Sequence, residues 1–364
     1  MKDLGKKKLL IIAGGIVGLL ILIIIILLIY NSLFVKTSYK DIENKVVEAA
    51  KKYYSENESL LPTNENEEVQ TTDANLTASG HLKSMNKLTK KLGSTCTATV
   101  IVSYAGGNYR YTPLLDCGDK YSTKTIVSHI QNSVSRVTSG EGLYELNGEL
   151  VYRGEEPNNY VKFSDKLWRI VKITDNKLVI ILDEKSVKSV WDDRFNSDRN
   201  RTDGINDYKV SRIYEKLLEM YNGDTIFNDN TRGLLSSHNL YIGSRLDTDF
   251  YNDGSIEKAV LFEKQYIGLL PLYDYINASL DTNCNSAVTD SCINYNYLNQ
   301  YGFNWWTLTS DQANTHKVYR ITLDGSIGSI RASASSYVRP VIYLAKDALY
   351  TGGTGTSEDP YTIK

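Results

Sequence analysis

Residues 143–182 read LYELNGELVYRGEEPNNYVKFSDKLWRIVKITDNKLVIIL, and this stretch decides the fold class. Asn147-Gly148 is a strong type I′ turn signal, and Asp165 and Asp175-Asn176 mark two further turns. Runs of branched and aromatic residues lie between these turns, and such runs are typical of strands. They predict strands over 160–163, 166–173 and 177–182. The stretch therefore predicts an antiparallel meander within a β-rich domain that begins near Gly142.

The chain after the meander continues this domain to its end. Apolar residues at helical spacing predict helices over 207–221 and 269–277. Between them, residues 222–263 form a long polar insertion, where we expect a binding face because loops on rigid scaffolds carry function. Further strands are expected over 305–309, 317–323, 329–332 and 338–344. We therefore assign residues 142–364 to one α+β domain.

Four cysteines predict two disulfides. Gly106-Gly107 separates two strand-like runs and is a hairpin signal. Cys96 and Cys117 lie at equal distances on either side of this loop, so the hairpin brings them face to face. Cys284 and Cys292 then remain to pair with each other. Zinc ligation is the alternative, but the spacings fit no common zinc pattern.

A smaller domain precedes the β-rich one. Ser38 and Asp41 resemble a helix-opening capping box, and apolar residues at helical spacing follow them over 38–54. Together with the cysteine hairpin, this helix predicts a membrane-proximal domain over 36–122. Residues 123–141 are expected to be a linker.

The N-terminus carries an uncharged apolar run from Leu9 to Tyr30, preceded by a lysine cluster within residues 1–8. At about 1.5 Å per residue the run is long enough to cross a bilayer. The lysines indicate a cytoplasmic N-terminus, so the rest of the chain is expected outside the cell membrane. We predict a single-pass signal-anchor over 9–34 that contacts the lipid bilayer through residues 9–30. A cleaved signal peptide is the alternative, but the run is long and lacks a small-residue cleavage site.

Two groups of motifs resemble an uncharacterised family of surface proteins from low-GC Gram-positive bacteria. The first is Asn158–Phe163, Leu167–Ile170 and Trp191–Asn196; the second is Trp306–Thr309, Arg339–Leu344 and the Gly353–Thr356 run before Pro360-Tyr361. The resemblance covers about residues 142–364 and implies no activity. A more distant likeness to C-type-lectin-like domains of the formylglycine-generating-enzyme type implies a C-type-lectin-like fold, although that family's catalytic cysteines are absent.

The sequence contains few motifs or residues that could form a catalytic or ligand-binding site. It lacks a nucleophile elbow, a phosphate-binding glycine loop and a His-Glu-x-x-His motif. Its net charge of −2 gives no electrostatic reason to expect that the chain binds nucleic acid. Asp192, Asp193 and Arg194 are candidate ligand-binding residues, with a structural ion pair between Asp193 and Arg194 as the alternative. Trp305 is a candidate for stacking on a sugar, because alternation along a strand should turn one ring of Trp305-Trp306 outward.

The remaining polar residues are expected to be solvated. The four histidines stand apart in the sequence and are interpreted as surface residues, so no catalytic residue is assigned. Two oxygen-rich stretches, 198–207 and 247–253, contain the side-chain types that bind calcium, but neither matches EF-hand spacing. No cofactor is therefore expected, with calcium as the one candidate.

These features favour a membrane-anchored surface protein that binds a glycan or protein, or that has a structural role in the envelope. The first alternative is a hydrolase or modifying enzyme of the cell wall, which would need converging carboxylates in a pocket. The second is a pilin-like assembly subunit, although the apolar run lacks a prepilin processing site.

Overall fold

The computed structural model describes residues 37–364, except for residues 66, 106, 251, 300 and 301. The predicted signal-anchor, residues 9–34, and the predicted cytoplasmic segment, residues 1–8, lie outside the described residues. Among the residues that are described, no helix is both long and apolar enough to cross a membrane.

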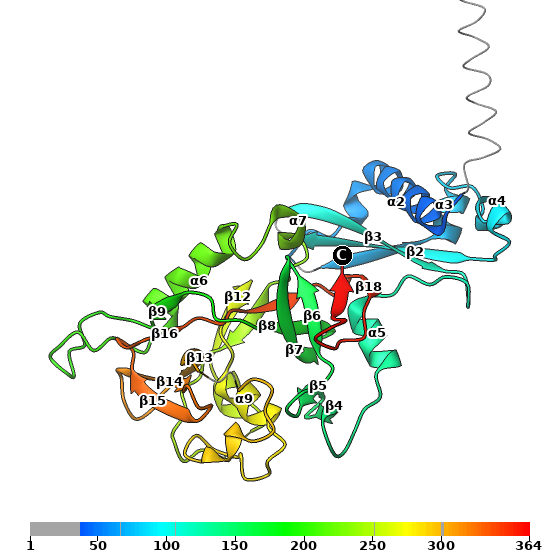
Figure 1. The fold of residues 1–364 in the computed structure, drawn as a ribbon. Helices are drawn as coiled ribbons and strands as arrows, with labels where there is room; N and C mark the ends of the chain where they lie inside the picture. Colours follow the sequence, from blue (N-terminus) through cyan, green and yellow to red (C-terminus); the bar gives the residue numbers. More distant parts are fainter. Residues whose placement is uncertain (1–36, 66, 106, 251, 300–301) are drawn as a thin grey trace, which may run out of the picture. The chain divides into compact units, whose positions relative to one another are not determined.

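The described chain has a mixed α+β fold, rich in β-structure and with several sheets (Figure 1). It divides into two compact units. The described part of the first unit comprises residues 37–56, 71–100 and 113–122, and the second comprises 57–70, 101–112 and 123–364.

The first unit is built around helix α2, Tyr39–Glu56. The Ser38 amide donates to the Asp41 carboxylate at 2.7 Å, and the Asp41 amide donates to the Ser38 hydroxyl at 3.2 Å. These two bonds satisfy amides that the first helical turn leaves unpaired, so the predicted capping box is confirmed. The shorter helices are α3, Asp73–Ala78, and α4, Met85–Leu88.

Strands β1, Glu68–Thr72, β2, Thr97–Ala105, and β3, Asn108–Asp116, form a three-stranded sheet in that order. Both predicted disulfides are present. Cys96 and Cys117 are joined with their Cα atoms 4.2 Å apart, and Cys284 and Cys292 with theirs 4.5 Å apart. The reading of the cysteines as disulfides, not as zinc ligands, is therefore confirmed.

The core of the second unit contains a mixed sheet with the order β12-β17-β8-β7-β6-β19-β18, to which the β4–β5 hairpin is attached through β7. The predicted meander is confirmed as β6, β7 and β8. The turn between β4 and β5 has φ of 52° at Asn147 and 79° at Gly148, as a type I′ turn requires. The strands of this sheet are β4, Gly142–Leu146; β5, Glu149–Arg153; β6, Tyr160–Phe163; β7, Lys166–Thr174; β8, Lys177–Leu182; β12, Ile267–Gly268; β17, Val341–Leu344; β18, Tyr350–Gly352; and β19, Tyr361–Ile363.

A second sheet in this unit has the order β15-β14-β13-β16-β9. The three helices α5, α6 and α9 contribute buried residues to the same hydrophobic core. The strands are β9, Lys188–Val190; β13, Trp305–Ser310; β14, Lys317–Ile321; β15, Ile327–Arg331; and β16, Ser335–Tyr337; the helices are α5, Ile126–Ser133; α6, Arg212–Asn222; and α9, Leu272–Ala278.

Two segments differ from their sequence-based description. Residues 123–141, expected to be a linker, contain helix α5, whose Ile126, Val127 and Ile130 are buried in the core of the second unit. The polar insertion 222–263 contains regular elements, because apolar residues scattered through it are buried. These elements are α7, Asp229–Arg232; β10, His238–Tyr241; and α8, Ser255–Lys258; strand β11, Leu261–Gln265, continues from the insertion and pairs with β10.

Candidate functional site

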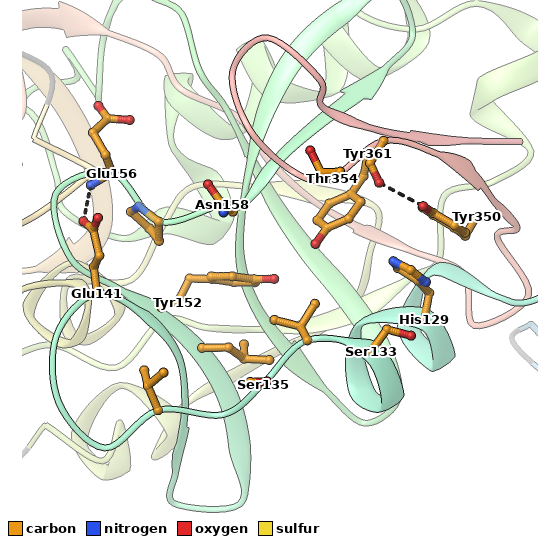
Figure 2. A pocket seen from close by; sticks show the side chains of 16 residues that line it. His129, Ser133, Ser135, Glu141, Tyr152, Glu156, Asn158, Tyr350, Thr354 and Tyr361 are labelled. Carbon is orange, nitrogen blue, oxygen red and sulfur yellow. Dashed lines mark hydrogen bonds between the residues drawn. The ribbon is translucent and has the colours of Figure 1, made fainter.

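A pocket of about 580 Å³ lies in the second unit where α5, the loop after it, β5 and the C-terminal strands β18 and β19 meet (Figure 2). This volume is within the range of small-ligand sites. The residues lining it are His129, Ser133, Val134, Ser135, Val137, Glu141, Gly142, Leu143, Tyr152, Glu156, Pro157, Asn158, Tyr350, Gly353, Thr354 and Tyr361.

Backbone contacts bring α5 and β18 together. The Thr125 hydroxyl caps α5 by accepting the Ser128 amide at 3.1 Å, and the Ile126 amide donates to the Ala348 carbonyl at 2.9 Å. The first turn of α5 is therefore attached to the residues just before β18, which places His129 against Tyr350.

Aromatic rings form one side of the pocket. The His129 and Tyr350 rings are stacked with centroids 3.7 Å apart and planes 6° apart. Tyr361 meets both of them edge-on, with centroid distances of 5.8 Å to His129 and 6.2 Å to Tyr350. Tyr152 is almost fully buried beside them. This side of the pocket is therefore lined by aromatic rings together with hydroxyl and imidazole groups.

The protonation states of these groups follow from burial. Burial lowers the pKa of His129, and the nearby Lys124 lowers it further. Burial raises the pKa of Tyr152 and of Tyr361. At neutral pH the site therefore presents a neutral imidazole and protonated phenols, which can donate and accept hydrogen bonds without carrying charge.

Two carboxylates lie on the side of the pocket away from His129 (Figure 2). Glu141 accepts the Glu156 backbone amide at 2.9 Å, and Glu156 accepts the Tyr160 hydroxyl at 3.2 Å. Both residues are exposed. Gly154 makes this arrangement possible, because a Cβ there would lie 2.2 Å from the Glu141 Cβ. These carboxylates are each held by a different donor and give the rim a negative charge.

The C-terminal glycine run forms a further wall. Gly355 has φ of +83°, and a Cβ at this position would meet the Tyr361 ring at 2.5 Å and the Asn158 carbonyl at 2.6 Å. Only glycine allows the chain to pass this close to the aromatic side of the pocket. The glycine run between 352 and 355 therefore shapes the site.

The ligand-binding residues predicted from the sequence lie elsewhere. Asp192 is fully buried and accepts the backbone amides of Arg194 and Ile205, each at 3.0 Å. Its ion pair with Arg194 is 2.7 Å long, whereas Asp193 lies on the surface and pairs with Arg212 at 3.4 Å. The expected ion pair between Asp193 and Arg194 is therefore replaced by one between Asp192 and Arg194, which closes a local loop.

Trp305 is also fully buried, as is Trp306. The expectation that one of these two rings faces outward is wrong, because sheet β15-β14-β13-β16-β9 has core on both faces of strand β13. Trp305 packs edge-on against Tyr275 with a centroid distance of 5.8 Å. Its ring is not available to a ligand at the surface.

Carboxylates of the two oxygen-rich stretches are engaged by donors of the protein, some within the same loop and some in strands β14 and β15. Asp247 accepts the Tyr319 hydroxyl at 2.7 Å, Asp249 accepts the Leu246 amide at 2.8 Å, and Asp253 accepts the Ser255 amide at 2.9 Å. Asp203 is buried and pairs with Arg199 and Arg331. Within the described ranges, no group of three histidine, cysteine, aspartate or glutamate residues is arranged to hold a metal ion.

The interpretation of all histidines as surface residues is wrong for two of them, because His238 and His316 are buried. His129 is half-buried and lines the pocket. The His238 ring stacks on Tyr343 with centroids 3.9 Å apart, and burial lowers its pKa to about 3. An aromatic partner distant in sequence leaves no local signal for such burial.

His238 should make the second unit sensitive to acid. In the unfolded chain a histidine gains its proton near pH 6.5, whereas folded His238 stays neutral down to about pH 3. Stability is therefore lost as the pH falls below 6.5, by about 2 kcal/mol between pH 7 and pH 5. His238→Phe keeps the stacked ring without the titration. Denaturation of both proteins at the two pH values should show about this extra loss in the wild type, and equal losses would contradict the assignment.

Comparison of the chain with protein-family models, with curated proteins and with solved structures finds no match. The function of the chain is therefore inferred from the geometry of the pocket.

Proposed function

We infer that the chain is a surface-displayed binding module whose pocket between α5, β5, β18 and β19 takes a short glycan. The observation that carries this proposal is the combination of the His129–Tyr350–Tyr361 aromatic side with an uncharged hydrogen-bonding lining and an acidic rim. Sugars present apolar C–H faces and many hydroxyls. Aromatic rings contact the former, while Asn158, Thr354 and the rim carboxylates can bind the latter.

The cellular setting is part of the same proposal. Residues 9–30 would anchor the chain in the cell membrane, with the N-terminus cytoplasmic and residues 36–364 outside the cell. The two disulfides support an oxidising compartment. The C-type-lectin-like fold remains a proposal as well, supported by the antiparallel meander, the long insertion and the sequence motifs that suggested it. Calcium is not required in this proposal.

Substitutions in the pocket should weaken glycan binding. We would screen the purified full-length chain in detergent, in oxidised form, on arrays of glycans and cell-wall fragments, with and without a chelator. For a glycan that binds, Asn158→Ala or Tyr350→Ala should cost about 1.4 kcal/mol by removing one contact, which is about tenfold in Kd. Chelation should leave binding unchanged.

The matched control is Asp193→Asn, which alters an exposed residue of the site predicted from the sequence alone and should bind as the wild type does. Two results would contradict the proposal: a well-folded chain that binds no glycan, or pocket variants that bind with unchanged affinity. A loss of binding in Asp193→Asn alone would move the site to the loop around Asp192.

A further inference from the structure

A lysine, an aspartate and a glutamate meet inside the core of the second unit, away from the pocket. The Lys172 ammonium nitrogen lies 2.9 Å from Asp274 Oδ1, 3.2 Å from Glu149 Oε2 and 2.6 Å from the Tyr273 hydroxyl. Lys172 and Asp274 are almost completely buried. The three donors of the ammonium can therefore all be directed at protein acceptors, and the nitrogen is held next to two carboxyl groups.

Three elements position these groups. Lys172 lies in β7 directly after an irregularity in its pairing with β8, and such a bulge redirects a side chain. Glu149 begins β5, and Val151 of that strand pairs with Lys172. Asp274 lies in the first turn of α9. The cluster thus joins a sheet and a helix, and Lys172 and Asp274 are separated by 102 in sequence.

Burial and the neighbouring charges act in opposite directions on the groups of the cluster. The Tyr273 ring lies 4.6 Å from the Lys172 nitrogen, and the buried Tyr343 contributes to its electrostatic environment. Burial raises the pKa of Asp274 to about 6, against the effect of Lys172. The two carboxylates raise the pKa of Lys172 in spite of its burial. Lys258 reaches the other Glu149 oxygen at 3.8 Å from the more exposed side.

A buried ion pair of this kind has a large desolvation free energy. Removing two charges from water costs several kcal/mol per ion, and the mutual attraction offsets this only in part. Converting the ammonium and the carboxylate into one neutral amide would remove both charges from the core. The Lys172 nitrogen lies 2.9 Å from Asp274 Oδ1 in a site shielded from water, so the two groups that would condense are already held together.

We propose that Lys172 and Asp274 condense to an intramolecular isopeptide bond, with Glu149 moving the proton. The Lys172 ammonium gives a proton to the Glu149 carboxylate, and the freed nitrogen lone pair attacks Cγ of Asp274. A C–N bond forms, one C–O bond of the carboxylate breaks, and the oxygen leaves as water. That water carries the proton returned by Glu149 and a second proton from the nitrogen. One ammonium and one carboxylate thus become one amide and one water, and no co-reactant is needed.

Such a bond would join β7 to α9 and close a loop that contains the whole polar insertion, residues 222–263. Cross-links that close long loops restrict the unfolded chain the most. The bond would resist reduction, unlike the two disulfides, and would suit a protein displayed outside the cell.

The mass of the full-length chain tests the proposal. After reduction of both disulfides, the intact wild-type protein should be lighter than its sequence by one water. A tryptic digest should contain one branched peptide that joins the segments around Lys172 and Asp274, without cleavage after Lys172. Lys177→Gln, which removes a lysine of the neighbouring strand that contacts the Ser237 carbonyl, should keep the water loss. Lys172→Arg and Asp274→Ala should abolish it.

A wild-type chain with the unmodified mass and separate peptides for the two segments would overturn the proposal without recourse to any variant. Glu149→Gln tests whether the glutamate moves the proton, because glutamine keeps the side-chain shape but cannot accept the proton. This variant should have the unmodified mass. If it still loses water, Glu149 is not the group that moves the proton.

Discussion

Replacing Arg245 by methionine should lower the free energy of unfolding of the second unit by about 3–5 kcal/mol, the usual effect of breaking a buried ion pair. Arg245 and Glu257 are both fully buried, and an Arg245 nitrogen lies 3.1 Å from Glu257. Burial raises the pKa of Glu257, and Arg245 opposes that rise. Without Arg245, the carboxylate would either stay charged in an apolar site or take up a proton, and both outcomes cost stability.

The double variant Arg245→Met with Glu257→Leu is the matched control. Apolar residues of similar size often replace a buried pair with little loss, so the double variant should recover most of the stability. All four tryptophans lie in the second unit, so urea denaturation followed by tryptophan fluorescence reports on this unit. A single variant within about 1 kcal/mol of the wild type would show that the pair does not stabilise the second unit as expected.

Local signals explain the parts of the fold that could be predicted. The meander β6–β7–β8 is bounded by turn residues with positive φ, such as Asp175 and Asn176. Such turns need only adjacent residues, and the alternation of strand-forming runs between them does not depend on the rest of the chain. The Cys96–Cys117 bond was likewise predictable, because a two-residue loop fixes which residues face each other.

The candidate site could not be predicted because its parts come from separate segments. His129 lies in a region without strong polar motifs, and its partner Tyr350 is near the other end of the chain. Backbone hydrogen bonds from Ile126 to Ala348 and from Tyr350 to Lys124 bring the two segments together. The glycine run near Gly355 was the one feature of the sequence that could have indicated the site, because glycine allows the backbone to approach aromatic rings closely.

Buried charged groups were a second reason why the sequence-based predictions for the second unit were partly wrong. Arg245 and Glu257 belong to an insertion that its composition marks as solvated. Composition averages over a segment, whereas burial is decided for each residue by partners that can lie in other segments. The same reasoning applies to Asp192, whose buried carboxylate accepts two backbone amides instead of binding a ligand.

The second substitution with a large expected effect is at Trp305. The sequence suggested that this ring stacks on a sugar, whereas in the structure it is fully buried in the core. Trp305→Ala should destabilise the second unit by about 3–5 kcal/mol, through lost transfer free energy and the cavity left behind. The ring packs against Tyr275, and the Arg339 guanidinium lies 4.8 Å from its centroid. Burial lowers the pKa of Arg339 to about 10. Removing the ring would therefore also remove a favourable contact of a buried cation.

Two controls separate packing from ligand binding. Trp305→Phe fills most of the same space and should cost less than the alanine variant. Phe195→Ala alters an exposed aromatic residue and should change the free energy of unfolding by no more than about 0.5 kcal/mol. Urea denaturation, followed through the three remaining tryptophans, compares the Trp305 variants. If Trp305→Ala kept full stability but lost glycan binding, Trp305 would be a ligand contact, and the pocket beside His129 would lose its place as the candidate site.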